Sequence, residues 1–387
     1  MILSKTLIDL MDKAVTHMKP IIAITAGDVA GIGPEVIIRA LLAERCSGRI
    51  VDFIPVLIGH PEIFRRALEL CESSLMVELV SEHILHSPSF GGVASRAFEQ
   101  GRLWCINPAG DAVLNAPKGK ISPEAGDAAF RYLDTAIELA LAGHVDAIAT
   151  APLNKEALHL AGHHYPGHTE ILAERCGIDD FAMMLHLPES SLTEWRRLIR
   201  PLNKSDGAAT LGSGISIAHV TLHTSVESVP GLLSVDNVSE KIGLMSDFLR
   251  GIECKRSAIA VCALNPHGGE NGLFGNEEQT IIRPAVERSQ ETVPNLHGPL
   301  PVDTLIRRAI SGEFDGVVAM YHDQGHIPVK LIGFDSAINI TLGLPIVRTS
   351  PTHGTAFDRA WNPATPADGH GMLEAIRMAA VLSSAGR

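Results

Sequence analysis

Apolar runs alternate with amphipathic stretches along most of this chain. The apolar runs at residues 21–25, 51–59 and 146–150 predict strands, whereas the patterns at 61–71 and 122–142, each with a proline near its start, predict helices. Strands that alternate with helices are typical of a mainly parallel sheet with helices on both faces. We therefore expect an α/β fold. At 387 residues the chain is long for one hydrophobic core, which favours two domains.

Three further apolar runs lead directly to a histidine. Residues 217–222 run into His223, residues 258–264 continue through Asn-Pro to His267, and residues 316–320 continue through Tyr321 to His322. Ligands of parallel α/β sheets bind outside the carboxyl ends of the strands, so these histidines can converge on one point. Neutral imidazole is the commonest metal ligand, and the pattern indicates a catalytic metal site. The alternative is that they are ordinary surface or core histidines.

A second set of polar residues follows His322. Lys330, Asn339 and Arg348 are separated by β-like apolar segments at 329–334 and 338–347. Two fixed cations and an amide beside a metal suit a phosphorylated or carboxylated substrate. The alternative is that Lys330 and Arg348 are the solvated ends of strands.

Four other segments are candidates for a structural or a functional role. His168 and Thr169 are expected to start a helix, with Thr169 near its N-cap and His168 placed to bind an anion. Asp303 either caps a helix or takes part in catalysis. The glycine-rich turn at 26–33 has neither the dinucleotide nor the Walker spacing, so it is either a tight turn or a ligand-facing loop. Residues 188–214 are polar and predict a surface loop, with a flap over the site as the alternative. Residues 72–121 hold short β-like pieces whose order the sequence does not settle.

Composition excludes several classes of protein. The formal net charge of −12 argues against a nucleic-acid or anionic-membrane partner. The six cysteines are scattered with no C-x-x-C pair, which is typical of reduced thiols. The first 18 residues do not form a secretory signal, and no apolar run approaches the ~20 residues of a membrane span. We expect a soluble cytoplasmic protein.

Several of these segments, in this order, resemble the 4-hydroxythreonine-4-phosphate dehydrogenase family. They are TAGDVAGIGPEV, IATAPLNKEAL, YPGHTE, LNPHGGENGLFGNEE, GPLPVDT, AMYHDQGHIPVKLIGF and NITLGLPIVRTSPTHGTAFD. Within the family, APLNKEALHLAG, YPGHTE and YHDQGHIP look most like the branch that acts on D-threonate or D-erythronate 4-phosphate. The HGTAFD segment is similar to the cofactor loop of isopropylmalate dehydrogenases. This chain departs from the family in its N-terminal extension and in the segment 188–214.

The resemblance implies a two-domain isocitrate/isopropylmalate dehydrogenase-like fold with the active site in the interdomain cleft. The expected parts are an extension at 1–18, a first domain at 19–152 and 343–387, and a second domain at 153–342 that carries the metal site and a homodimer interface. The implied site has four groups, in which one histidine, expected to be His322, enters from the other subunit. The metal ligands are His223, His267 and His322; the substrate contacts are His168, Thr169, Lys330, Asn339 and Arg348; the nearby acids are Asp303 and Asp323; the cofactor loop contains His353, Gly354, Thr355 and Asp358.

The expected reaction is the NAD-dependent oxidation of the C3 alcohol of a four-carbon 3-hydroxy acid 4-phosphate, with loss of CO₂ to give dihydroxyacetone phosphate. The implied metal is one divalent ion per site, with Zn²⁺, Mg²⁺, Mn²⁺ and Co²⁺ all open. Candidates for the base are Asp303, Asp323 and Lys155. One alternative is the 4-hydroxy-L-threonine-4-phosphate dehydrogenase of pyridoxal phosphate biosynthesis. Two others are a non-redox metal-dependent lyase or epimerase and a ligand sensor without turnover.

Overall fold

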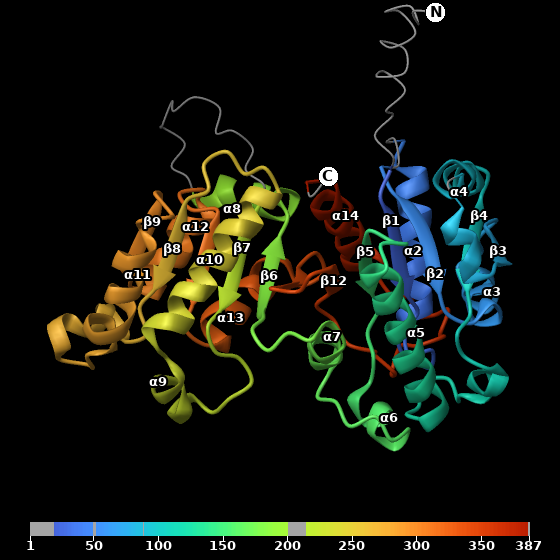
Figure 1. Ribbon diagram of the computed structural model, residues 1–387, viewed down its shortest axis with the longest axis horizontal. Coiled ribbons are helices and arrows are strands. Elements are labelled where there is room, and N and C mark those ends of the chain that lie inside the picture. Colours follow the sequence, from blue (N-terminus) through green and yellow to red (C-terminus); the bar gives the residue numbers. More distant parts are fainter. Residues whose placement is uncertain (1–18, 49–51, 88, 200–213, 386–387) are drawn as a thin grey trace, which may run out of the picture.

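The computed structural model describes residues 19–48, 52–87, 89–199 and 214–385 (Figure 1). Within these ranges twelve strands form one sheet in the order β3-β4-β2-β1-β5-β12-β11-β6-β7-β10-β8-β9. The strands are β1 (Ile21–Thr25), β2 (Ile54–Ile58), β3 (Met76–Leu79), β4 (Arg102–Ile106), β5 (Ala147–Thr150), β6 (Ala182–Leu187), β7 (Ile215–His219), β8 (Ile259–Cys262), β9 (Leu296–Leu300), β10 (Gly316–Ala319), β11 (Ile338–Leu342) and β12 (Val347–Pro351).

Most neighbouring strands are parallel, which confirms the predicted α/β class. The exceptions lie at the middle of the sheet, where β11 is antiparallel to both β12 and β6, and β6 is antiparallel to β7. Strands β7, β10 and β8 are parallel neighbours, so their carboxyl ends lie at the same edge. This arrangement brings the segments that carry His223, His322 and His267 to one side of the sheet.

Helices cover both faces of the sheet. The α-helices are α2 (Gly33–Cys46), α3 (Pro61–Leu70), α4 (Phe90–Glu99), α5 (Pro123–Leu141), α6 (Lys155–Leu160), α7 (His168–Cys176), α8 (Glu189–Ile199), α9 (Val229–Leu232), α10 (Val235–Gly251), α11 (Arg283–Ser289), α12 (Val302–Ile310), α13 (His322–Gly333) and α14 (His370–Ala385). Strand β10 illustrates why a layer of helices is needed on each face of the sheet. Val317 packs into the cluster that contains Leu305 of α12, whereas Val318 packs into the cluster that contains Ile242 of α10. Successive side chains of a strand point to opposite faces, so both faces of this apolar strand are buried.

Two predicted segments fold differently. Residues 189–199 form helix α8 and not a loop, because Leu192 is fully buried and Trp195 Nε1 donates to the carbonyl of Ile332 at 3.3 Å. The rest of the predicted loop, residues 200–213, lies outside the described residues, as does the extension at 1–18. Residues 329–333 belong to helix α13 and not to a strand, with Val329 buried and Leu331 exposed.

Residues 72–121, in which the sequence did not settle the order of the elements, contain a helix as well as strands. Helix α4 lies between β3 and β4 and contacts β4. None of the helices in the described part of the chain is both long and apolar enough to cross a membrane.

Candidate active site

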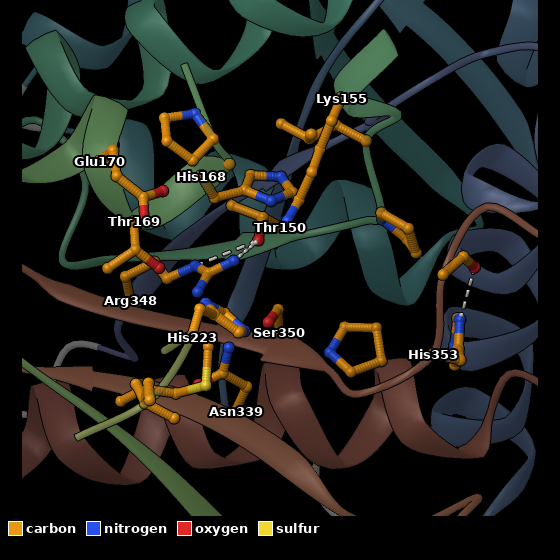
Figure 2. Close-up of a pocket in the computed structure, with 18 of the residues that line it drawn as sticks. Thr150, Lys155, His168, Thr169, Glu170, His223, Asn339, Arg348, Ser350 and His353 are labelled. Carbon is orange, nitrogen blue, oxygen red and sulfur yellow. Dashed lines mark hydrogen bonds between the residues drawn. The ribbon is translucent and has the colours of Figure 1, made fainter. Parts of the chain in front are cut away.

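A cavity of about 210 Å³ lies where strands β5, β11 and β12 approach the start of α7 (Figure 2). Its polar lining comes from both segments of the chain that were expected to form separate domains. These polar residues are Thr150, Lys155, His168, Thr169, Glu170, His223, Asn339, Arg348, Ser350 and His353. The predicted substrate contacts, except Lys330, are therefore brought together.

Arg348 is the most buried cation of this lining, with 2% of its surface exposed. Its Nη2 donates to Thr150 Oγ1 at 2.8 Å and its Nη1 donates to Thr341 Oγ1 at 3.2 Å. Among the ion pairs between described residues, none joins Arg348 to a carboxylate, although the charge of Glu170 acts on it. Burial lowers the pKa of Arg348 to about 10, so the group is still charged at pH 7. A buried guanidinium held by neutral hydroxyls favours an anionic ligand. The alternative of a solvated strand end is therefore wrong for Arg348.

His168 and Thr169 form the first turn of α7. Gly167 is the N-cap, so Thr169 is the second helical residue and not the cap. Burial lowers the pKa of His168 well below its usual value, and the nearby charge of Arg348 adds to this effect. A neutral His168 and the free N–H groups of a helix start can together donate hydrogen bonds to an anion.

Lys155 and Glu170 flank Gly167 at the rim of the cavity. A Cβ atom added at Gly167 would lie 3.4 Å from Glu170 Oε2 and 3.7 Å from Lys155 Cε, so the glycine lets both side chains approach. Figure 2 shows the side chain of Lys155 reaching towards His168 and Thr150. Glu170 was not among the predicted site residues, although it belongs to the same YPGHTE motif as His168 and Thr169.

Two buried polar atoms of the lining have no hydrogen-bond partner among the described residues. They are Oδ1 of Asn339 and Nε2 of His353. His353 Nδ1 lies 3.2 Å from the carbonyl oxygen of Gly354, so Nδ1 donates and Nε2 carries the lone pair. Buried polar atoms are normally paired, and these two atoms are therefore suited to bind a ligand.

His223 joins this cavity to a second one. His223, His322 and Asp323 line a neighbouring cavity of about 430 Å³, and the ring centroids of the two histidines are 6.0 Å apart. Asp323 Oδ1 lies 2.7 Å from His322 Nδ1, which places the proton on Nδ1 and leaves Nε2 free as a ligand. Burial lowers the pKa of His223, with smaller contributions from Lys155 and His322, so His223 is neutral at pH 7.

His267 lines neither of these two cavities. It is exposed on the turn Pro266–Gly272, where residues 267–271 all have positive φ, and its ring lies 6.5 Å from that of Phe274. No three His, Cys, Asp or Glu side chains within the described ranges of one chain are arranged to hold a metal ion. The three predicted ligands therefore do not converge within a single chain.

Two buried histidines that the sequence analysis did not select lie behind His322. Strand β7 ends at His219 and not at residue 222, and His219 Nε2 lies 3.2 Å from His326 Nδ1. Burial lowers the pKa of His219 to about 4 and that of His326 to about 3. The i, i+4 spacing of His322 and His326 was a sequence signal, but it is informative only once residues 322–333 are known to be helical.

The remaining predicted site residues line neither of the two cavities of the single chain. Lys330 is exposed on α13, two turns beyond His322, and Asp303 is exposed in the first turn of α12. Asp358 is exposed as well. The carbonyl oxygen of Thr355 accepts a hydrogen bond from the backbone N–H of Ile32 at 2.9 Å.

That hydrogen bond joins the glycine-rich turn to the 353–358 loop, against which it packs. A Cβ at Gly31 would lie only 2.7 Å from the carbonyl oxygen of Thr355, so a larger residue would displace the loop. Asp28 is fully buried within the turn and accepts a hydrogen bond from the N–H of Ala30 at 2.9 Å. Burial raises the pKa of Asp28 to about 6.

Comparison with known proteins agrees with this combination of residues. Residues 52–379 match the family model described as pyridoxal phosphate biosynthetic protein PdxA. The chain belongs to this family. The D-threonate 4-phosphate dehydrogenase of Pectobacterium atrosepticum is 42% identical over 345 residues, which cover 89% of this chain and 94% of that protein. The 4-hydroxythreonine-4-phosphate dehydrogenase of Desulfosudis oleivorans is 38% identical, over 93% of this chain and 95% of that protein.

Solved structures give the same result. A 4-hydroxythreonine-4-phosphate dehydrogenase from Klebsiella pneumoniae is similar with a TM-score of 0.74 and 39% identity, covering 95% of this chain and 99% of that chain. A terephthalate 1,2-cis-dihydrodiol dehydrogenase from Burkholderia xenovorans has a TM-score of 0.60 and 26% identity, covering 94% and 98%. These matches confirm the family resemblance and the expectation of a dehydrogenase.

Proposed function

We propose that this protein is an NAD-dependent, divalent-metal-dependent dehydrogenase of D-threonate 4-phosphate or D-erythronate 4-phosphate. The C3 alcohol loses a hydride to NAD⁺ and a proton to a base, which gives the 3-keto acid. That acid then loses CO₂, and protonation at C2 yields dihydroxyacetone phosphate. The proposal rests on Arg348, which is buried, has no carboxylate partner among the described residues and lines the same cavity as His223. An anion-binding group therefore lies in the same cavity as a potential metal ligand.

The substrate contacts follow from the cavity. Arg348, His168 and Thr169 bind one anionic group of the substrate, and the unpaired amide oxygen of Asn339 accepts a hydrogen bond from a hydroxyl. We retain Lys330 as a contact to the phosphate, because it projects from the helix that carries His322. Lys155 is our choice for the group that takes the C3 hydroxyl proton, since it lines the cavity. Asp323 is bound to His322, and Asp303 lies outside the cavity.

His223 and His322 of one chain, with His267 of a second chain, would hold the metal. The donor set fits such an ion, since His223 is neutral and the Nε2 atom of His322 is free. When bound, the ion would lower the pKa of the C3 hydroxyl, and the nicotinamide would accept the hydride. His353, Gly354, Thr355 and Asp358 would hold the dinucleotide, with Nε2 of His353 available as an acceptor.

A homodimer would supply the missing ligand. Helix α13 exposes Ile327 and Leu331, and its C-cap residue Phe334 is exposed as well, at i, i+4 and i+7. The turn that carries His267 leads into two more exposed apolar residues, Leu273 and Phe274. Exposed apolar stripes of this kind mark protein–protein contacts, and pairing these two surfaces would bring His267 to the partner's cavity. We therefore assign the shared ligand to His267 and not to His322.

The test is a spectrophotometric assay of NADH formation with a panel of four-carbon acid 4-phosphates. Each substrate is tried with Mg²⁺, Mn²⁺, Co²⁺ and Zn²⁺ after removal of bound metal with a chelator. The expected result is NADH from D-threonate or D-erythronate 4-phosphate, metal-dependent, with dihydroxyacetone phosphate detected by coupling to glycerol-3-phosphate dehydrogenase. Substrate consumption without NADH would favour a lyase or epimerase, and binding without turnover would favour a sensor.

The second candidate is the oxidation of 4-hydroxy-L-threonine 4-phosphate. It is favoured by the relatives that carry this name, such as the protein of Desulfosudis oleivorans. An amine or a hydroxyl at C2 could each complement the same cavity. A kcat/KM at least about tenfold higher for the amino acid, which corresponds to about 1.4 kcal/mol, would select this candidate.

A further inference from the structure

His219 and His326 form a buried pair directly behind His322. Only 1% of His219 and 8% of His326 is exposed. The rings of His326 and His322 are stacked, with centroids 3.6 Å apart and planes 10° apart. His326 is in turn hydrogen-bonded to His219 at the end of β7. The ring of His322 is therefore linked through His326 to strand β7 of the sheet.

The hydrogen bonds determine which nitrogen of each ring carries the proton. His219 Nδ1 lies 3.3 Å from the carbonyl oxygen of Met183, which only accepts, so Nδ1 of His219 is protonated. Its Nε2 must then accept from His326 Nδ1. His326 Nδ1 also lies 3.2 Å from the carbonyl oxygen of His322, which again requires a proton on Nδ1. Both donor assignments agree, and the pair has one arrangement of its protons.

The backbone of α13 is shaped for this contact. A Cβ at Gly325 would lie 2.3 Å from His219 Nε2 and 2.8 Å from Ile217 Cγ2. A glycine at position 325 therefore lets the helix approach β7 closely enough for His326 to reach His219. Apolar residues would fill the same space without fixing the direction of a ring, because dispersion contacts are not directional.

We propose that His326 and His219 are positioning residues that hold the imidazole of His322 in the orientation in which it binds a cation. This rests on the proposed function, in which His322 is a metal ligand. Asp323 fixes the tautomer of His322 from one side, and the stacked, anchored ring of His326 fixes its plane from the other. Groups that orient a ligand in this way typically contribute 10- to 100-fold in metal affinity.

The experiment compares four proteins: the parent, His326→Ala, His326→Phe and His186→Gln. His186 is the matched control, because it is another buried histidine of the same sheet, with Nδ1 2.9 Å from Ser216 Oγ. Co²⁺ titrations, followed by the visible absorption of the bound ion, measure affinity, and thermal unfolding measures stability. We expect His326→Ala to bind Co²⁺ about 10- to 100-fold more weakly than the parent. His326→Phe should recover part of this loss, since it keeps a flat ring on His322. His186→Gln should lose stability but not Co²⁺ affinity.

A second measurement needs no metal. Imidazole ¹⁵N–¹H correlation spectra of the metal-free protein should show His219 and His326 protonated at Nδ1, and His219 should keep this signature in His326→Phe, because the carbonyl oxygen of Met183 fixes it. Parent-like Co²⁺ affinity in both His326 variants, or protonation of both rings at Nε2, would overturn the positioning role. A parent protein that binds no Co²⁺ would instead overturn the proposed metal site.

Discussion

Arg348 and Thr150 lie on neighbouring parallel strands, 198 positions apart, and the guanidinium donates to the threonine hydroxyl through both Nη2 (2.8 Å) and Nε (3.2 Å). The contact holds the charged group at the wall of the cavity without neutralising it. Arg377 differs in this respect, because its guanidinium is paired with the carboxylates of Glu44 and Glu374. The contrast between the buried Arg348, which has no carboxylate partner among the described residues, and the paired, half-buried Arg377 leads to the first prediction.

Arg348→Ala should reduce kcat/KM by about 1.5–3 kcal/mol, the range for a hydrogen bond to a charged group. Arg377→Ala removes a cation of similar size far from the cavity, so it should lower the free energy of unfolding and leave kcat/KM unchanged. Steady-state kinetics with the 4-phosphate and with the acid lacking phosphate separate the two contributions. If both substrates lose equally in Arg348→Ala, the arginine does not bind the phosphate.

Subunit mixing tests which histidine is shared. His223 and His322 line one cavity, so a dimer of His223→Ala and His267→Ala chains should contain one intact site and regain activity. A dimer of His223→Ala and His322→Ala chains should contain none. Activity is measured after exchange has been verified by native mass spectrometry. Recovery in the second mixture but not in the first would reassign the shared ligand to His322.

The imidazole of His223 should stay neutral below the usual histidine range. Burial lowers the pKa of His223 below the ordinary value of 6.5. His223 therefore remains neutral as the pH falls through 6.5 and becomes protonated only at lower pH. Imidazole NMR spectra of the metal-free protein between pH 5 and pH 8 measure this titration. Half-protonation of His223 already above pH 6.5 would contradict the prediction.

Asp28 should make the protein less stable as the pH rises. Its pKa is raised from 3.8 to about 6 by burial, so the folded state binds the proton more tightly than the unfolded state. The contribution of this proton to the free energy of unfolding is fully present below pH 3.8. It is lost as the pH rises towards 6 and beyond, by up to about 3 kcal/mol in total. Asp28→Asn should flatten this part of the profile of unfolding free energy against pH, measured by urea denaturation. An unchanged slope between pH 4 and pH 6 in the variant would rule out this role of Asp28.

Gly31→Ala should weaken the binding of NAD. The added Cβ would lie 2.7 Å from the Thr355 carbonyl oxygen, so the 353–358 loop must move. We expect the KM for NAD to rise by about fivefold or more, equivalent to about 1 kcal/mol, with a smaller change in the KM for the substrate. Gly92→Ala in helix α4 is the control, since nothing lies within 4 Å of its added Cβ. Equal effects of the two substitutions would exclude contact between the turn and the cofactor loop as the cause.

The sequence by itself determined the class of fold and several of its elements. Strand β1 has its predicted bounds, and α3 and α5 agree to within one residue at each end, because proline at the helix start and apolar runs are local signals. The motifs also determined the family and the residues His168, Asn339 and Arg348 that line the cavity. His168 starts helix α7, and Asn339 and Arg348 are the second residues of strands β11 and β12.

Only the tertiary structure decided which of the three predicted histidines lie in the same cavity. The sequence predicted that His223, His267 and His322 meet at one edge of the sheet, but His267 lies exposed on the turn at 267–271 and does not line the cavity of the other two. The structure also shows that residues 329–333, predicted as β-like, belong to helix α13, in which Val329 is buried. That helix brings His326 onto His322 and within reach of His219, 107 positions away in the sequence. A contact over that separation depends on packing between β7 and α13, which no local pattern of residues specifies.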